Sequence, residues 1–174
     1  VAPGVRWIRM GLPFALDHIN LWLLRDTLNG TQGWSIVDCC IDKAESRALW
    51  GQIFATQPAG LPILRVIVTH MHPDHIGLAH WLCGRWQVPL WISATDFNVA
   101  RMASQGTTGF GGDSAARFFA SHGLTDPASI EKIRARANYY PSMVPAVPAS
   151  YYRMMDVDAI AIGRNNWRCV SVYG

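Results

Sequence analysis

The sequence predicts an α/β domain in which helices cover one face of a sheet and a partner sheet covers the other. Two observations carry this prediction. From residue 34 to residue 93, segments with the composition of strands alternate with segments of helical spacing, which implies parallel strands joined by crossover helices. The chain has 174 residues, of which 50% are hydrophobic and 16% are charged, so it can bury the core of one domain.

The first part of the chain is expected to be antiparallel and the next part parallel. Asn29-Gly30 lies within residues 26–33, which we interpret as a hairpin-type connection. The strand at 63–68 follows Pro62 and is rich in β-branched residues, which indicates a buried strand. The elements expected up to residue 93 are strands at 5–10, 19–24 and 34–38, a helix at 43–56, a strand at 63–68, a helix from about 75 to 86 and a strand at 89–93.

Three histidines and one aspartate lie within six residues where the strand at 63–68 meets the following helix, in the run His-Met-His-Pro-Asp-His at 70–75. Side chains two residues apart in extended backbone point the same way, so His70 and His72 can reach one metal together. Asp74 and His75 lie past the bend and would face a second position nearby. Imidazole and carboxylate ligands suit zinc, and less often iron or manganese. The motif therefore predicts a site for two metal ions.

Simpler interpretations of these residues exist. Asp74 precedes an apolar helical run and could cap that helix. His70 could be a hydrogen-bonded histidine at the end of a strand. Neither alternative explains why three histidines and an aspartate lie so close together.

Residues 95–152 differ in character from the segments before them, and we interpret them as a helical insertion at the mouth of this site. A glycine-rich loop at 105–112 and an irregular, proline-marked return are its main features. The insertion is expected to serve as a substrate lid or a dimer contact, and the alternative is a packing decoration without a functional role. The elements expected from residue 95 onward are helices at 96–103, 114–122 and 126–140, and strands at 156–162 and 167–173 joined as a hairpin.

The composition favours a small-molecule substrate over a nucleic acid or a membrane. The net charge is +3 and Lys43 and Lys132 are the only lysines, whereas nucleic-acid-binding proteins usually cluster basic residues. The sequence has no run of eighteen apolar residues, so no membrane span is expected. The four cysteines form no Cys-x-x-Cys pair, which favours buried reduced thiols in a cytoplasmic protein.

The histidine motif resembles the signature of the metallo-β-lactamase fold superfamily, and further matches lie on both sides of it. The run Trp-Ser-Ile-Val-Asp at 34–38 resembles the family's strand that ends in an acidic residue, although Cys39-Cys40 replace the usual Thr-Gly. Residues 167–174 resemble the strand that leads into the family's Gly-His motif. The resemblance implies that residues 1–174 form the first half of an αββα sandwich, with the helical insertion at 95–152.

The resemblance also implies roles for the motif. His70 and His72 would hold the first metal, and Asp74 and His75 the second. Asp74 would also act in catalysis by orienting a water that the metals activate. Asp38 would accept an N–H from a ligand histidine, and the alternative is a turn residue at a strand end. The implied activity is hydrolysis of a small ester, lactone or thioester by two divalent ions, with zinc as the first choice.

The chain is expected to be an incomplete domain. The family's third histidine and bridging acid would lie beyond Gly174. An uncovered sheet face would expose large apolar side chains, so a second copy in a homodimer or a missing C-terminal fragment is expected to cover it. The 174 residues alone are therefore expected to be inactive, and the full-length protein to be the enzyme. The alternative is a metal-free fragment or scaffold that binds a partner through this face.

Overall fold

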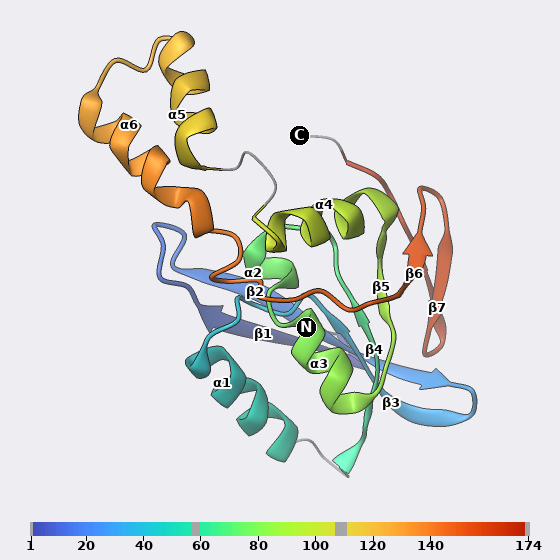
Figure 1. The fold of residues 1–174 in the computed structure, drawn as a ribbon. Helices are drawn as coiled ribbons and strands as arrows, with labels where there is room; N and C mark the ends of the chain where they lie inside the picture. The colour runs from blue at the N-terminus through green and yellow to red at the C-terminus, as the bar shows by residue number, and fades with distance from the viewer. Residues whose placement is uncertain (1, 57–59, 107–110, 173–174) are drawn as a thin grey trace.

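A six-stranded sheet forms the centre of the computed structural model, which describes residues 2–56, 60–106 and 111–172. The strands are β1 (Val5–Gly11), β2 (His18–Leu28), β3 (Thr31–Val37), β4 (Ile63–Ile67), β5 (Leu90–Ser93), β6 (Tyr151–Met154), β7 (Ala159–Ile162) and β8 (Asn165–Arg168). The central sheet has the order β1-β2-β3-β4-β5-β6, and β7 and β8 form a separate hairpin (Figure 1). β1, β2 and β3 pair antiparallel, and the pairs from β3 to β6 are parallel, as the sequence predicts up to β5.

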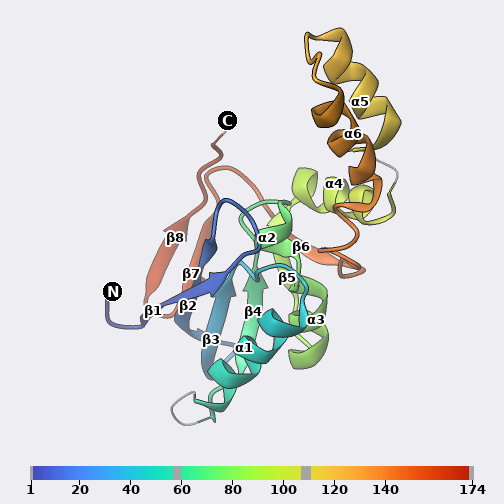
Figure 2. The same cartoon turned by 90° about the vertical axis from the view of Figure 1, so that its left-hand side faces the viewer.

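Helices connect the parallel strands. They are α1 (Ala44–Ala55), α2 (Pro73–Ile76), α3 (Ala79–Trp86), α4 (Ala94–Ser104), α5 (Gly112–Ser121) and α6 (Pro127–Arg134), the last followed by a 3-10 turn at Ala135–Asn138. In Figure 2, α1 and α3 lie on one side of the sheet and β7–β8 lies on the other. This arrangement confirms the predicted α/β class with helices on one face.

The main core lies between the sheet and the helices that cover it. Ile36 of β3 and Val66 of β4 are fully buried, as is Leu82 of α3. Trp50 of α1 is also fully buried, and its indole Nε1 donates to the carbonyl oxygen of Cys39 at 2.9 Å. Packing of α1 therefore also fixes the loop that follows β3, where Asp38 lies.

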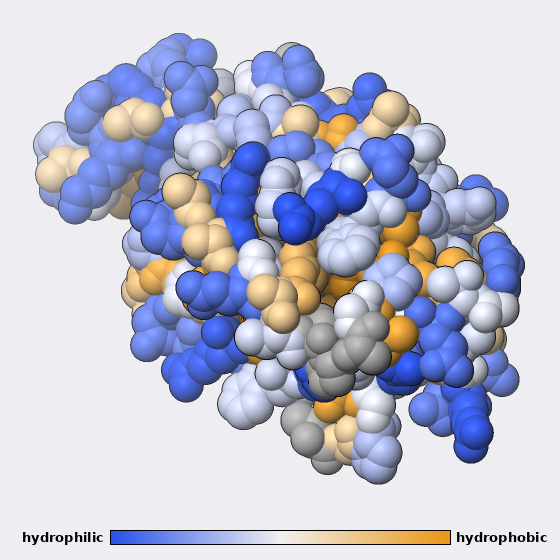
Figure 3. Space-filling view, turned by 90° about the horizontal axis from the view of Figure 1, so that it is seen from below, coloured by the Kyte–Doolittle hydropathy of each residue, from blue (hydrophilic) through white to orange (hydrophobic). Residues whose placement is uncertain are grey.

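The β7–β8 hairpin covers part of the other face of the sheet. Ile160 and Ile162 of β7 pack against Leu24 of β2 and Ile67 of β4. Seen from below, the surface of the molecule carries apolar side chains in small patches between hydrophilic ones (Figure 3).

A buried ion pair ties the same hairpin to the sheet. Arg65 of β4 donates to the Asp26 carboxylate of β2 at 2.7 Å and to the carbonyl oxygen of Ala161 at 2.5 Å. Asp26 also accepts from the hydroxyl of Ser35 at 2.5 Å and from the backbone N–H of Gly163 at 2.9 Å. The hairpin is therefore held by polar contacts as well as by apolar packing.

Several expected elements differ from the structure. The helix expected at 75–86 is two helices, because the Leu78 N–H bonds the carbonyl oxygen of Cys40 at 3.0 Å and the chain passes too close to Gly77 for any side chain: a Cβ there would lie 2.6 Å from the Ile41 Cα. The helix expected at 126–140 ends at Arg134 and continues as the 3-10 turn. The connection expected at 26–33 is the two-residue turn Asn29-Gly30, so Asp26 belongs to β2.

The end of the chain also departs from expectation. β6 begins at the end of the stretch interpreted as an irregular return and continues beyond it, and it pairs with β5 in the central sheet. β7 and β8 are shorter than the strands expected at 156–162 and 167–173. Half of the glycine-rich loop expected at 105–112, namely residues 107–110, lies outside the described residues, as does residue 173. α5 and α6 form a helical hairpin that projects beyond the sheet (Figures 1 and 2).

Candidate metal centre

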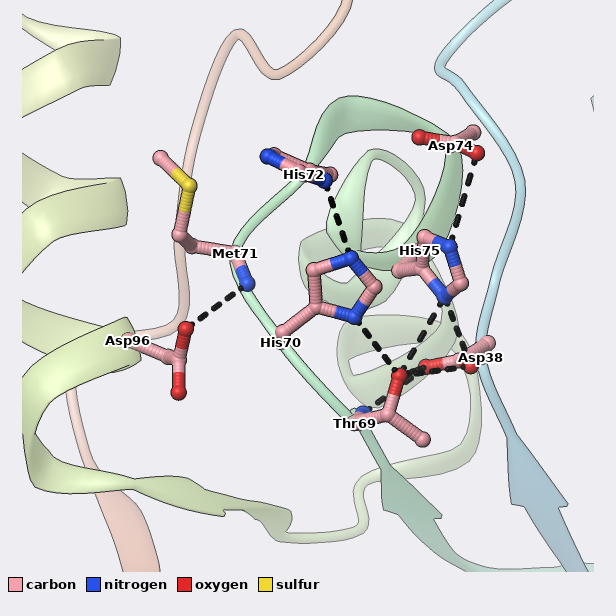
Figure 4. A network of polar contacts seen from close by, with 8 residues as sticks. All are labelled: Asp38, Thr69, His70, Met71, His72, Asp74, His75 and Asp96. Carbon is pink, nitrogen blue, oxygen red and sulfur yellow. Dashed lines mark hydrogen bonds and ion pairs between the residues drawn. The ribbon is translucent and has the colours of Figure 1, made fainter. Parts of the chain in front are cut away.

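The residues singled out by the sequence meet where β3 and β4 end. The two strands are parallel, with Val37 opposite Ile67, so the loops that follow them emerge at the same edge of the sheet. Asp38 follows β3, His70 and His72 lie on the loop after β4, and Asp74 and His75 lie on α2. Figure 4 shows the five side chains together.

Asp38 is the centre of a hydrogen-bond network. Its carboxylate is buried and accepts from the backbone N–H of Thr69 at 2.8 Å and from the Nδ1 of His75 at 2.8 Å (Figure 4). A carboxylate can only accept, so Nδ1 of His75 carries the proton and Nε2 keeps the lone pair that a metal requires. Burial alone would lower the pKa of His75, but the hydrogen bond and charge of Asp38, together with the charge of Asp74, raise it.

Thr69 extends this network to the second histidine. Its hydroxyl lies 2.9 Å from the Asp38 Oδ2, to which it donates. The Thr69 hydroxyl oxygen also lies 3.0 Å from the Nδ1 of His70 and can accept a hydrogen bond from it. Nε2 of His70 is then the atom with an available lone pair. Asp38 and Thr69 therefore leave the Nε2 atoms of His75 and His70 available to bind a metal.

His70 and His72 direct nitrogen atoms at each other. The Nε2 of His70 lies 3.0 Å from the Nδ1 of His72, and the two rings meet edge to face with centroids 4.6 Å apart. Burial lowers the pKa of His70, and the nearby His75 and His72 lower it further. A lowered pKa favours the neutral imidazole, which is the form that binds metal.

This donor set fits a divalent metal in chemistry and in spacing. Two nitrogen ligands at zinc distances of about 2.0–2.1 Å in a tetrahedron lie about 3.3 Å apart, close to the separation of the two imidazole nitrogens. The Nε2 of His75 lies 3.5 Å from the Asp74 Oδ2, a second pair of donors. Within residues 2–56, 60–106 and 111–172, no three histidine, cysteine or acidic side chains are grouped as a metal cluster. The possible metal donors are therefore arranged as two pairs, His70 with His72 and Asp74 with His75.

Asp74 and Asp38 differ in how far their simpler interpretations apply. Asp74 lies in the first turn of α2, whose N-cap position is His72, so Asp74 does not cap the helix. Asp38 does occupy a strand-end position, with a φ of 61°, and its carboxylate also orients His75. Asp38 is thus a strand-end residue that also contacts His75, whereas the role of His75 as a metal ligand is a prediction.

The sequence predicted no specific role for three residues near the motif. Thr69 directly precedes His70, and this position beside the motif is the only indication of its role that the sequence gives. Asp96 accepts from the backbone N–H of Met71 in the loop after β4, and in the sequence its capping pattern with Ser93 indicates only the start of a helix. Tyr140 contacts the same loop from 69 residues away, and its place in the insertion expected at the mouth of the site allowed it to face the pocket or to pack in the core.

Comparison with known proteins identifies the family of the chain. Residues 15–137 match the model of the metallo-beta-lactamase superfamily. No curated protein matches the chain.

Two solved structures are similar over nearly the whole chain. A beta-lactamase domain protein from Burkholderia ambifaria is 51% identical, with a TM-score of 0.86, over 97% of this chain and 47% of that one. A metallo-beta-lactamase family protein from Thermus thermophilus is 22% identical, with a TM-score of 0.69, over 97% of this chain and 52% of that one, and it shows the fold alone. The chain spans about half the length of these two proteins. Since the family model covers well over half of the chain, the chain belongs to the metallo-beta-lactamase superfamily.

Proposed function

We propose that this protein is a metal-dependent hydrolase of a small ester, lactone or thioester, with His70, His72, Asp74 and His75 as metal ligands. Membership of the superfamily supports hydrolysis. The observation that carries the proposal is the 3.0 Å approach of the His70 and His72 nitrogens, beside a His75 whose Nε2 is kept available by Asp38. Two divalent ions are proposed, zinc first, with iron or manganese as alternatives.

Each of these residues has a distinct task in the proposed reaction. Divalent ions bound here would supply a water of lowered pKa and polarise the substrate carbonyl. His70 and His72 bind through Nε2 and Nδ1. Asp74, whose side chain is 18% exposed, orients the attacking water and accepts its proton at a carboxylate oxygen. Thr69 and Asp38 fix the imidazole orientations and do not touch the substrate.

The proposed substrate is a small molecule. The two lysines lie apart in the sequence, at 43 and 132, which does not favour a nucleic-acid surface. No helix in the described part of the chain has the length and apolar character that crossing a membrane requires. A cytoplasmic location is part of the proposal, and free cysteines at four described positions support it. A homodimer is likewise proposed as one assembly that would cover the sheet.

A substrate panel tests the proposal. Lactones, thioesters, phosphodiesters and β-lactams are assayed with the full-length protein and added zinc or manganese. Turnover of at least one ester, lactone or thioester is expected, since the metals would polarise a carbonyl. Turnover confined to phosphodiesters would contradict the substrate class. Absence of stoichiometric metal after purification without chelators would favour the alternative, a non-catalytic scaffold that binds a partner.

Removing the Thr69 hydroxyl should weaken metal binding with little change in shape. Thr69→Val is expected to raise the zinc dissociation constant about 10-fold or more, because residues that orient ligand histidines typically carry that much affinity. Competition with a chromophoric chelator measures the constant. Thr56→Val is the matched control, since Thr56 donates its hydroxyl to the Gln52 carbonyl oxygen at the end of α1, outside the site. Equal zinc affinity in Thr69→Val and wild type would remove Thr69 from the network.

A further inference from the structure

The peptide groups between the two neighbouring histidines are held from both sides by a later part of the chain. The backbone N–H of Met71 donates to the Asp96 Oδ1 at 3.1 Å (Figure 4). The carbonyl oxygen of Met71 accepts from the hydroxyl of Tyr140 at 2.6 Å. The first contact fixes the peptide that joins His70 to Met71, and the second fixes the peptide that joins Met71 to His72. Both peptide planes on which the ligand pair depends are therefore constrained.

Asp96 is itself rigidly placed. It lies in the first turn of α4, an 11-residue helix, and Ser93 caps that helix by accepting the Asp96 N–H at 3.0 Å. The Ser93 hydroxyl also donates to the Asp96 Oδ2 at 2.5 Å, which leaves Oδ1 directed at Met71. The positive end of the helix dipole favours the charged carboxylate at this position.

Tyr140 is equally well fixed. Only 6% of the residue is exposed, and it lies in the main core with Met143 and Val144. The Val144 N–H donates to the Tyr140 carbonyl oxygen at 2.9 Å, so the backbone is held in a turn. Burial, together with the nearby charge of Asp96, raises the pKa of Tyr140. The phenol therefore keeps the proton that it donates to Met71.

We infer that Asp96 and Tyr140 are positioning residues that set the spacing of His70 and His72 for metal binding. This inference rests on the proposed function. It gives the stretch 95–152 a role in building the metal site, in addition to the lid or contact role expected from the sequence. Small changes in the orientation of a ligand lower affinity strongly, because a metal shell tolerates only small departures in distance and angle.

Single substitutions on each side of Met71 test this role. Tyr140→Phe keeps the ring and removes only the hydroxyl, and Asp96→Ala removes the acceptor. Each is expected to raise the zinc dissociation constant about 10-fold, the lower end of the range for residues that support ligands. Asp96→Asn retains an oxygen acceptor and should restore most of the affinity. Bound Co²⁺ should show an altered visible absorption spectrum in Tyr140→Phe, since its ligand geometry changes.

Two control variants separate positioning from general damage. Tyr151→Phe removes a hydroxyl from another ring that packs against the same core, where it stacks on Phe97. Asp126→Ala removes a helix-capping aspartate from α6, where it accepts the Ser129 N–H. Both controls should bind zinc as the wild type does.

The outcomes distinguish this inference from the proposed function. Zinc affinities equal to wild type in both Tyr140→Phe and Asp96→Ala would overturn the inference and leave the proposed function standing. If the wild-type protein binds neither zinc nor iron nor manganese, the proposed function fails, and hydrogen exchange in the metal-free protein decides the inference. Faster amide exchange across residues 70–75 in these two variants, and not in the controls, supports positioning, whereas unchanged exchange overturns it.

Discussion

Replacing His72 with alanine is expected to lower metal occupancy and abolish hydrolysis together. The substitution removes the Nδ1 that lies 3.0 Å from the His70 Nε2, and with it one of the proposed ligands of the first metal. Loss of a ligand should cost more affinity than the about 10–100-fold loss that follows removal of a supporting residue. Elemental analysis of the purified protein and the initial rate on the best substrate of the panel give the two measurements.

His122→Ala is the matched control for this experiment. His122 follows α5 and is exposed, and its Nδ1 contacts the carbonyl oxygen of Phe118 on the same helix. Metal content and rate should stay at wild-type values in that variant. If His72→Ala lost only metal or only activity, the assignment of His72 as a ligand for the reactive metal would be wrong.

Replacing Arg65 with leucine is expected to destabilise the fold by about 3–5 kcal/mol, because the buried Asp26 carboxylate would lose its charged partner. Asp26 is 0% exposed and Arg65 2%. The variant also removes the contact between Arg65 and the Ala161 carbonyl oxygen, which helps to hold the β7–β8 hairpin. Urea unfolding measures the change in the free energy of unfolding.

An exposed ion pair provides the comparison. Arg117 contacts Asp113 on the surface of α5, and Arg117→Leu should cost only about 0–1 kcal/mol, because solvent screens exposed pairs. A loss below about 1 kcal/mol for Arg65→Leu would contradict the expectation for a buried pair.

The effect of Arg65→Leu should depend on pH. Burial alone would raise the pKa of Asp26, but hydrogen bonds from Ser35, Gly163 and Arg65 and the charge of Arg65 lower it. A lowered pKa contributes stability that is present above the unfolded-state value of about 3.9 and is lost as the pH falls through the folded-state value. The difference between wild type and variant should therefore be largest near neutral pH and shrink below about pH 4.

The sequence predicted the features that are local. The histidine motif and the strand before it are contiguous, so composition and spacing were enough to bring His70, His72 and His75 to one junction. Asp38 was expected beside them because of the family resemblance, and its carboxylate does contact His75. The family resemblance and the α/β class are confirmed, whereas the metal, the ligand roles and the substrate class remain predictions.

Features that depend on distant parts of the chain were not predicted. β6 has four residues and pairs with β5 across an interval that contains α4, α5 and α6, so a local pattern cannot identify its partner. Arg65 was placed within a buried strand, but nothing near it in the sequence indicated that Asp26 would neutralise it. The break at Gly77 likewise comes from the loop at 39–41, which packs against it in three dimensions.

The contacts of Met71 have a consequence for how this site evolves. Asp96 and Tyr140 bind the main chain of Met71, so its side chain takes no part in either hydrogen bond. Every residue with a backbone N–H can make both contacts, and proline alone would lose the first. Selection for the spacing of the two histidines would therefore constrain the residue type at position 71 very little. It would constrain the acidic residue at 96 and the tyrosine at 140. Substitutions that disturb the histidine pair without replacing a histidine are therefore expected mainly at positions 96 and 140, which lie outside the histidine motif.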